Sequence, residues 1–450
     1  MSTKAPKSLA NKWQELLSWM AIAITSITIM AAYIATGKIY TEDPTATDFY
    51  KFYLSAERLK TGESPYWKLP PRLNKGDPCE EKNRWTQLQN QKPVNENDIK
   101  SFNPSSSCLH PNLNPPIFGL VILPLSSVPF KLAWWIWASL STISGIFAMW
   151  LLGKRHTTSK ASHLKKTAWL CIALFLYYPT YCNFAYGQVT LFLLLPLTLS
   201  WLALERNQPL RAGAWLGIAT AFKPIFALFI VSLLASRKPR AAASLISTTC
   251  VISFAGLLWL GGPVHADYAL ALRDITWTTS NWNASLTGFF ARIFGGAENP
   301  PWLHPPLLGD AATTFFSLLI IFMLFGAIKQ TKPLGHAERA AHVYALTIPA
   351  LILISPLGWI YYFPLLTLSL FPAWHHAHNS NKKDIATITA ISAIAITAIP
   401  RELERASDMN NATAWLWHGP LYTYALLAIF TTSFYLACQS SKRPHKAVST

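Results

Sequence analysis

The sequence predicts an all-α, polytopic integral membrane protein. Of its 450 residues, 51% are hydrophobic and only 13% are charged, whereas about 25% of the residues in an average soluble protein are charged. Apolar runs of about 18 residues or more recur along the whole chain, and a helix of that length crosses the roughly 30 Å of hydrocarbon in a bilayer. Together these observations indicate a bundle of membrane-spanning helices.

We expect about ten transmembrane helices. Their approximate ranges are 17–36, 131–153, 167–184, 189–204, 241–261, 308–328, 340–354, 360–374, 385–400 and 419–438. Basic residues gather in short connectors, which in membrane proteins face the cytoplasm. With that orientation the spans alternate, both termini lie inside, and the chain forms one transmembrane domain, 1–450. The outer side then carries a large first loop at 37–115 and further segments at 262–307 and 401–418.

Residues 209–240 do not fit this alternation, because basic residues flank both ends. A single span would place one basic cluster outside, so we expect a re-entrant hairpin of two short helices, 211–222 and 224–236. Pro224 favours a break, since proline lacks a backbone donor and disfavours helix at the preceding Lys223. A lysine in such apolar sequence is costly unless it is paired or hydrated, so Lys223 is a functional candidate. The alternative is an amine that reaches the membrane interface.

The net charge of +17 does not indicate a nucleic-acid partner, because the positive residues lie in the short connectors between spans. Cys79 and Cys108 both fall in the first outer loop. An oxidising compartment allows them to form a disulfide, and two separate thiols are the alternative. The other four cysteines fall in or beside spans, where we expect them to pack as small hydrophobic residues.

The stretch TDFYKFYLSAERLKTGESPYW, residues 47–67, is dense in aromatic and charged side chains and follows the first span. A carboxylate held at the membrane surface, such as Asp48, can activate a hydroxyl by accepting its proton. For Glu42, Asp43 and Glu57 we favour a solvated or helix-capping role. This stretch therefore offers one candidate base for chemistry at the outer surface.

Arg292 lies on an amphipathic outer stretch, and arginine binds phosphate in a bidentate manner. A lipid headgroup would suit it equally. The sequence contains no glycine-rich phosphate loop followed by lysine, no His-Glu-x-x-His motif and no Gly-x-Ser-x-Gly motif. Their absence argues against an ATP-driven pump and against a serine hydrolase.

The order of several motifs resembles that of glycosyltransferase family 87. The 47–67 stretch is similar to the family's opening Asp-Phe-x-x-Tyr-Tyr pattern, and NPPIFGLVILPLSSVP at 114–129 is similar to its Pro-Pro and Pro-Leu stretch. YGQVT at 186–190, AGAWLGIATAFKP at 212–224 and NASLTGFFAR at 283–292 correspond to three further motifs. No single motif decides the resemblance, which rests on their order.

The resemblance extends over about residues 45–365 and implies the GT-C fold, a bundle of about ten transmembrane helices plus the hairpin. Members of that superfamily take a sugar from a polyprenyl-phosphate carrier on the non-cytoplasmic face. We therefore expect a hexosyltransferase, with mannose as the expected sugar, in the inner membrane of a bacterium with its site facing the periplasm. The acceptor hydroxyl would belong to a glycolipid, a glycan or a protein. A pentose donor of the arabinose type is an alternative.

The resemblance also assigns roles to individual residues. It implies that Asp48 is the catalytic base, and that Lys223 and Arg292 bind the donor phosphate. Because cations can neutralise that phosphate, we expect no metal and no cofactor. The remaining candidates for substrate binding are Tyr53, Tyr66, Gln188, Asn283, Ser285, Trp359 and Tyr361.

Two positions depart from the family pattern. Thr190 stands where the family has asparagine, and Tyr361 and Tyr362 stand where it often has two histidines. If those histidines assist donor binding, this chain handles its sugar differently.

A transporter or lipid flippase is the rival interpretation from another class. It would explain the spans, the broken hairpin and the lysine within it. It would not explain the aromatic and acidic pattern at 47–67, and the two halves of the sequence show no inverted repeat. We therefore favour the enzyme.

Overall fold

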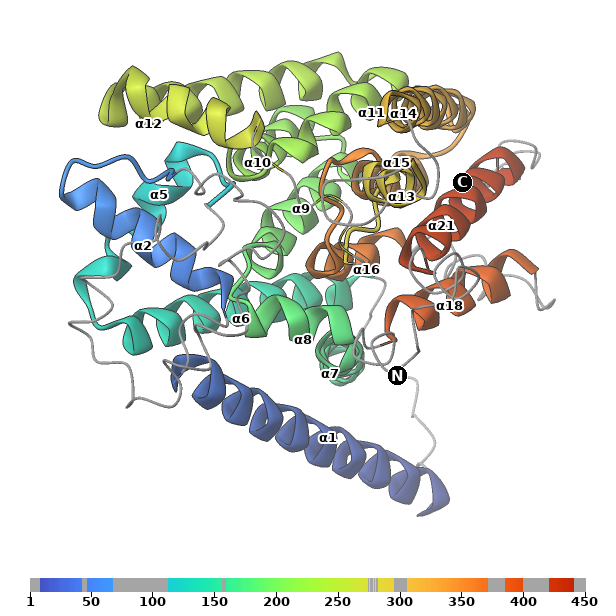
Figure 1. Cartoon of the computed structure of the whole chain (residues 1–450). Coiled ribbons are helices and arrows are strands. Elements are labelled where there is room, and N and C mark those ends of the chain that lie inside the picture. Colours follow the sequence, from blue (N-terminus) through green and yellow to red (C-terminus); the bar gives the residue numbers. More distant parts are fainter. Residues whose placement is uncertain are drawn as a thin grey trace.

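The computed structural model describes residues 9–42, 47–67, 112–155, 159–273, 275, 278, 280, 282–294, 306–370, 385–399 and 421–440. Within these residues the chain forms helices and no β-strand (Figure 1). A single isolated β-bridge joins Asn283 to Trp359.

The helices follow one another along the chain with short connections. In order they are α1 (Leu9–Glu42), α2 (Asp48–Lys60), α5 (Pro116–Ile122), η3 (Leu125–Ser127), α6 (Phe130–Lys154), α7 (Lys160–Leu176), α8 (Tyr178–Ala185), α9 (Thr190–Glu205), α10 (Pro209–Phe222), η4 (Pro224–Leu228), α11 (Phe229–Ala235), α12 (Pro239–Arg273), α13 (Leu286–Phe294), α14 (Pro306–Gln330), α15 (His336–Ile354), η5 (Ile360–Leu365), α16 (Leu366–Ser369), α18 (Ile385–Thr397) and α21 (Leu421–Ser440).

Six of the described helices are long and apolar enough to cross a membrane, namely α1, α6, α12, α14, α15 and α21. Helices α8 and α9 together form a seventh candidate span, which is bent by 119°. Further apolar helices at 224–235, 360–369 and 388–397 are shorter. The expected fold class, an all-α polytopic membrane protein, is confirmed, whereas the expected number of ten spans stays a prediction.

The structure corrects the expected span at 167–184, which consists of parts of two helices. Tyr177 is extended, with φ −70° and ψ 117°, and it separates α7 from α8. Pro179 lies in the first turn of α8, where its missing N–H interrupts no helical hydrogen bond. The outer segments also begin later than expected, because α1 and α12 continue beyond residues 36 and 261.

Helices α9 and α15 form the centre of the bundle and are buried along almost their whole length (Figure 1). The ring of Tyr344 on α15 contacts those of Trp201 on α9 and Phe229 on α11, with centroid distances of 5.8 and 4.9 Å. The hydroxyls of Ser232 and Thr347 share a hydrogen bond of 2.6 Å. Within a bilayer, such close packing and polar contacts hold helices together, because lipid removes the hydrophobic drive between them.

The expected break at Lys223 is confirmed. Helix α10 ends at Phe222, Lys223 is extended with φ −141° and ψ 99°, and η4 and α11 follow. Pro224 begins η4 and accounts for the break, since proline disfavours helical backbone at the residue before it. The two helical parts of the hairpin therefore have nearly the bounds that the sequence predicts.

Helices α10 and α12 lie side by side and run in the same direction. A Cβ placed on Gly213 would lie 2.2 Å from the carbonyl oxygen of Ala241, and one on Gly217 would lie 2.6 Å from the Cβ of Thr248. Only glycine permits so close a contact. Because α10 and α12 start at the same end of the bundle, the chain between them must leave that end and return to it.

The hairpin ends lie in a part of the bundle that is rich in positive charge. Lys238 donates a hydrogen bond of 2.6 Å from its Nζ to Oδ1 of Asn207 and so joins the two ends of the hairpin. Arg155, at the end of α6, forms an ion pair with Glu205, at the end of α9. Loss of hydration, and then the charge of Arg339, lower the pKa of Lys238. We call this region the basic end; α9 begins at the opposite, outer end.

Arg206→Cys and Arg240→Cys should react with a membrane-impermeant maleimide from the same side, because both positions flank the hairpin at the basic end. Glu63→Cys, in the loop after α2, should react from the other side. The measurement is labelling of right-side-out and inverted vesicles in a background without the native cysteines. Labelling of the two flanking positions from opposite sides would show that the segment between them crosses the membrane.

Candidate active site

Asp48 is the first residue of α2 and lies at the outer end of the bundle. The hydroxyl of Thr47 accepts a hydrogen bond of 3.3 Å from the backbone N–H of Phe49 and caps the helix. A carboxylate in the first turn is favoured by the helix dipole, which is positive at this end. Sequence and local structure thus agree that Asp48 is held as a carboxylate at a helix N-terminus.

The aromatic residues of α2 pack into the bundle and fix this helix in place. The ring of Phe49 stacks on Trp137 of α6 with a centroid distance of 6.1 Å, and Phe52 meets Phe118 of α5 at 5.0 Å. Tyr53 is buried, and its hydroxyl donates a hydrogen bond of 2.9 Å to the carbonyl of Val128. Its expected role in substrate binding stays a prediction, since its hydroxyl bonds to the protein backbone.

The turn between α8 and α9 lies directly against the start of α2. The N–H of Phe49 donates a hydrogen bond of 3.0 Å to the carbonyl of Tyr186, and the indole of Trp137 donates one of 2.7 Å to that of Gly187. Gly187 has φ +60°, and a Cβ on it would lie 2.5 Å from the Cβ of Phe49. Both the backbone angle and the close contact require glycine here.

The carboxylate of Asp48 has a partner on each oxygen. Nζ of Lys51 lies 2.7 Å from Oδ1, and Nε2 of Gln188 donates to Oδ2 at 2.6 Å. Since each carboxylate oxygen has two lone pairs, an acceptor position remains on both. The side chain is 22% exposed, so the structure orients the carboxylate and leaves it open to a substrate.

Aromatic rings extend from Asp48 toward the hairpin. We call Tyr186, Trp282, Trp359, Tyr361 and Tyr362 the aromatic wall; neighbouring rings contact one another at centroid distances of 5.3 Å for Tyr186–Trp282, 6.1 Å for Trp359–Tyr361 and 5.2 Å for Tyr361–Tyr362. Tyr361 lies within electrostatic range of both Asp48 and Tyr186. The wall therefore joins the carboxylate to the segment that replaces the family's histidines.

Lys223 lies at the far side of this wall. Its Nζ donates a hydrogen bond of 3.2 Å to the hydroxyl of Tyr362 and lies 5.4 Å from the centroid of that ring. No carboxylate among the described residues forms an ion pair with Lys223. A cation without a neutralising partner at this position can receive an anionic group.

Tyr66 closes the Lys223 side of the site. Its ring contacts that of Tyr268 on α12 at 5.4 Å, and its hydroxyl donates a hydrogen bond of 2.7 Å to the carbonyl of Asn114. Burial, and then the neighbouring Tyr268, raise the pKa of Tyr66 well above its usual value, so the phenol stays protonated. This contact ties the loop after α2 to the segment before α5.

Asn283 and Ser285 hold two loops together. The side-chain oxygen of Asn283 accepts hydrogen bonds of 2.7 Å from the N–H of Gly358 and 3.2 Å from that of Ser285, and its amide nitrogen donates to the carbonyls of Thr278 and Pro356. The hydroxyl of Ser285 accepts from the N–H of Gly288 at 3.1 Å and begins α13. Both side chains are buried, so their substrate-binding assignment stays a prediction that this geometry does not favour.

Arg292 is 2% exposed and binds the same loop. Its Nη1 donates hydrogen bonds of 2.9 Å to the carbonyls of Ser280 and Asn283. A residue that holds backbone in this way positions the neighbouring Trp282 of the aromatic wall. Phosphate binding by Arg292 stays a prediction, and no described contact joins it to Lys223.

Several expectations lie outside the described residues, namely the proposed disulfide partners Cys79 and Cys108 and the acidic residue Asp43. Among the described residues, no three or more His, Cys, Asp or Glu side chains gather as a metal site would require. A mechanism without a metal stays a prediction.

Sequence reasoning did not single out Lys51, Tyr186 or Trp282. A signal was present for the first two: Lys51 lies one helical turn after Asp48, where an ion pair forms readily, and Tyr186 precedes the Gly-Gln turn of a matched motif. For Trp282 there was no such signal, since its place depends on the loops that Asn283 joins.

Comparison with known proteins agrees with these motifs. Residues 112–356 match the model of "Glycosyltransferase family 87". Over 254 residues the chain is 25% identical to the "Polyprenol-phosphate-mannose-dependent alpha-(1-2)-phosphatidylinositol pentamannoside mannosyltransferase" of Mycobacterium tuberculosis (strain CDC 1551 / Oshkosh), which covers 55% of either chain. The chain thus matches about half the length of this curated relative. The family match includes Gln188 and Lys223, whereas Asp48 precedes it.

Gly187→Ala should lower the free energy of unfolding by about 2 kcal/mol or more, because alanine is strained at positive φ and its Cβ would collide with Phe49. The displaced start of α2 should also reduce catalytic turnover per folded molecule. Thermal melts and transfer assays measure the two effects. Gly326→Ala on α14 is the control, since an added Cβ there meets no atom within 4 Å. An unchanged melt for Gly187→Ala would contradict the packing described.

Proposed function

This chain belongs to glycosyltransferase family 87, and we propose that it transfers a hexose from a polyprenyl-phosphate donor to an acceptor hydroxyl at the outer membrane surface. The name of the mycobacterial relative specifies a polyprenol-phosphate-mannose donor and a phosphatidylinositol mannoside acceptor. We propose mannose as the sugar and a glycolipid of this class as the first acceptor to test. The observation that carries the proposal is Asp48, a fixed and partly exposed carboxylate at the end opposite the basic end.

In the proposed reaction, Asp48 is the general base. The acceptor oxygen attacks C1 of the sugar while the bond between C1 and the phosphate oxygen breaks. The proton of the acceptor hydroxyl passes to the Asp48 carboxylate, and the electron pair of the broken bond stays on the lipid phosphate. Lys51 and Gln188 hold the carboxylate in one orientation, so its remaining lone pairs face a defined position.

Lys223 is proposed to bind the departing phosphate. Negative charge grows on that group in the transition state, and a cation fixed nearby lowers the barrier without any need to reorganise. Tyr362, the hydrogen-bond partner of Lys223, keeps the amine at the edge of the aromatic wall. Between the carboxylate and this amine, the rings of the wall offer apolar and hydroxyl-bearing surface to a sugar and exclude water from it.

The charge distribution supports an outward-facing site. Basic connectors face the cytoplasm in membrane proteins, and the described connectors with Arg155, Arg206 and Lys238 lie at the end away from Asp48. We therefore propose that the site faces the periplasm of a bacterial inner membrane, where polyprenyl-linked sugars are used.

Incubation of the purified chain with radiolabelled polyprenyl-phosphomannose and phosphatidylinositol mannosides tests this proposal. Transfer of label to the glycolipid is expected, and polyprenyl-phosphoarabinose in place of the donor tests the pentose alternative. Movement of labelled donor across proteoliposomes without formation of a glycoside would instead establish a transporter.

Asp48→Asn should reduce transfer per folded molecule by about 10²- to 10⁴-fold, because the amide keeps the size of the side chain but cannot accept a proton. Apparent affinity for the donor should remain. Glu57→Gln is the matched control: this residue lies on the same helix and pairs only with Lys60 at 3.0 Å among the described residues. Normal turnover of Asp48→Asn, measured beside a thermal melt, would exclude a catalytic role for this carboxylate.

Lys223→Ala should raise the apparent KM for the donor by about 10-fold or more, the usual effect of losing a hydrogen bond to a charged group. Its melting temperature should change little, since the amine makes only one described hydrogen bond. Arg292→Lys is the comparison, and the buried contacts of Arg292 predict a lower melting temperature instead. If Lys223→Ala keeps the parental donor KM, the phosphate binds elsewhere.

A further inference from the structure

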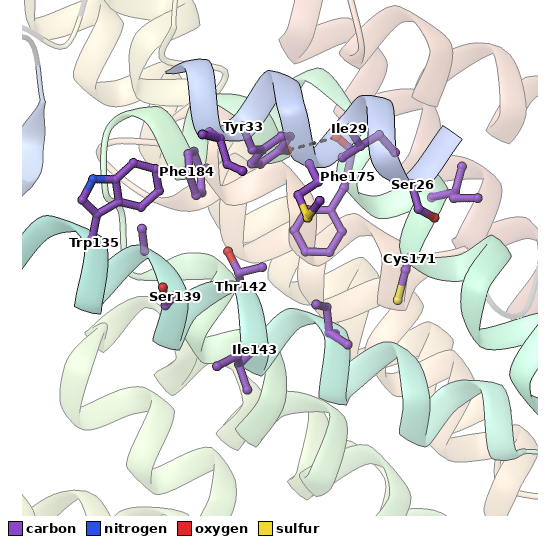
Figure 2. A pocket seen from close by; sticks show the side chains of 15 residues that line it. Ser26, Ile29, Tyr33, Trp135, Ser139, Thr142, Ile143, Cys171, Phe175 and Phe184 are labelled. Atoms are coloured by element: carbon purple, nitrogen blue, oxygen red, sulfur yellow. Dashed lines mark hydrogen bonds between the residues drawn. The ribbon is translucent and has the colours of Figure 1, made fainter. Parts of the chain in front are cut away.

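A long apolar groove lies between α1 and the helices α6, α7 and α8. It has a volume of about 500 Å³, within the range of about 300–1,000 Å³ that is usual for small-molecule sites. Figure 2 shows Ile29 and Tyr33 of α1 facing Ser139 and Thr142 of α6 across it, with Phe175 behind. Its apolar lining and its place along a membrane-spanning helix make it a site for a hydrocarbon chain.

The outer end of α1 connects this groove to the candidate active site. Within the groove, the ring of Tyr33 contacts that of Phe184 on α8 at 4.6 Å. Two turns further along α1, Tyr40 contacts Tyr186 at 6.0 Å. The carbonyl of Tyr186 accepts the hydrogen bond that fixes the start of α2 beside Asp48. A molecule with its chain in the groove would therefore bring its polar head to the Tyr186 side of Asp48.

Lys223 lies on the other side of the carboxylate. The aromatic wall leads from Tyr186, past Tyr361, to Tyr362 and the amine of Lys223. Figure 1 shows the same separation at the level of helices, with α1 at one edge of the molecule and α10 and α12 at the opposite edge. A lipid whose phosphate binds Lys223 thus has its chain on the side away from the groove.

We propose that the groove between α1 and α6–α8 binds a hydrocarbon chain of a lipid acceptor, so that donor and acceptor reach Asp48 from opposite sides. This inference rests on the proposed function, because it assigns the donor phosphate to Lys223. It names the acceptor class as a membrane lipid with a sugar or polyol headgroup. A protein or a soluble glycan has no chain to fill this site.

The arrangement also follows from the requirements of the transfer reaction. The acceptor oxygen must approach C1 from the face opposite the departing phosphate if the substitution proceeds in line. Two lipids that entered through one groove would present their headgroups from the same side. Two separate entrances, one at Lys223 and one along α1, hold the reacting groups on opposite sides of the sugar.

Photo-crosslinking tests which lipid occupies the groove. The probe is phosphatidylinositol with a diazirine in one acyl chain, added to the full chain in nanodiscs, and cross-linked peptides are identified by mass spectrometry. We expect labelling of α1 and α6 at the groove, competition by unlabelled phosphatidylinositol mannosides, and no competition by polyprenyl phosphate. Competition by polyprenyl phosphate would assign the groove to the donor and overturn the proposal. Equal labelling without competition by either lipid would show ordinary bilayer contact and also overturn it.

Ser139→Trp fills the groove and should remove the specific cross-links at least 5-fold, roughly the scale of losing one packed contact. Leu140→Trp is the matched control, since Leu140 is the next residue on α6, is exposed and does not line the groove. Thr142→Phe provides a second way to fill the groove if Ser139→Trp folds poorly. Equal labelling of the filled variants and the control would contradict the assignment.

A kinetic arm separates this inference from the proposed function. With acylated phosphatidylinositol mannosides, Ser139→Trp should raise the acceptor KM and leave the donor KM unchanged; with the deacylated, water-soluble acceptor it should behave like the parent chain. An increase in the donor KM alone would overturn the acceptor assignment while transfer itself stands. Absence of transfer by the parent chain would instead refute the proposed function, and the cross-linking result would still decide the lipid.

Discussion

The contact between the start of α2 and the turn after α8 determines the geometry of the whole site. The hydrogen bond from the N–H of Phe49 to Tyr186 sets Asp48 beside Gln188, and Gly187 makes that distance possible because it has no side chain. The same turn joins α8 to α9 at a sharp bend. One backbone contact therefore couples the candidate base, its orienting amide and the central helix of the bundle.

A second constraint is the separation of charge along the bundle. Positive connectors gather where α6, α9 and α12 meet, whereas Asp48 and Lys51 lie at the other end. Lys223 is the exception, because the hairpin carries it away from the basic end and toward Tyr362. An amine is costly in that apolar setting, and its position opposite a carboxylate gives the chain one group for a departing anion and one for a proton.

Local signals predicted part of this arrangement. The break at Lys223 followed from Pro224 and from the basic flanks, both of which can be read within a few residues, and the capped start of α2 followed from its motif. The separation of α7 from α8 was missed, since the sequence is apolar across it. The roles of Asn283 and Arg292 were not foreseen either, because their hydrogen bonds join loops that lie far apart in the chain. The pairing of Gln188 with Asp48 likewise needs the tertiary contact described above.

The most direct test of this account is a cryo-EM structure of the Asp48→Asn variant with polyprenyl-phosphomannose and a phosphatidylinositol mannoside bound. The account predicts the donor phosphate against Lys223 and the acceptor hydroxyl within hydrogen-bond distance of the side chain at position 48. It also predicts that the sugar lies along Tyr361 between them. A donor sugar bound away from position 48, with its phosphate held by other residues, would contradict the assignment of this carboxylate as the base.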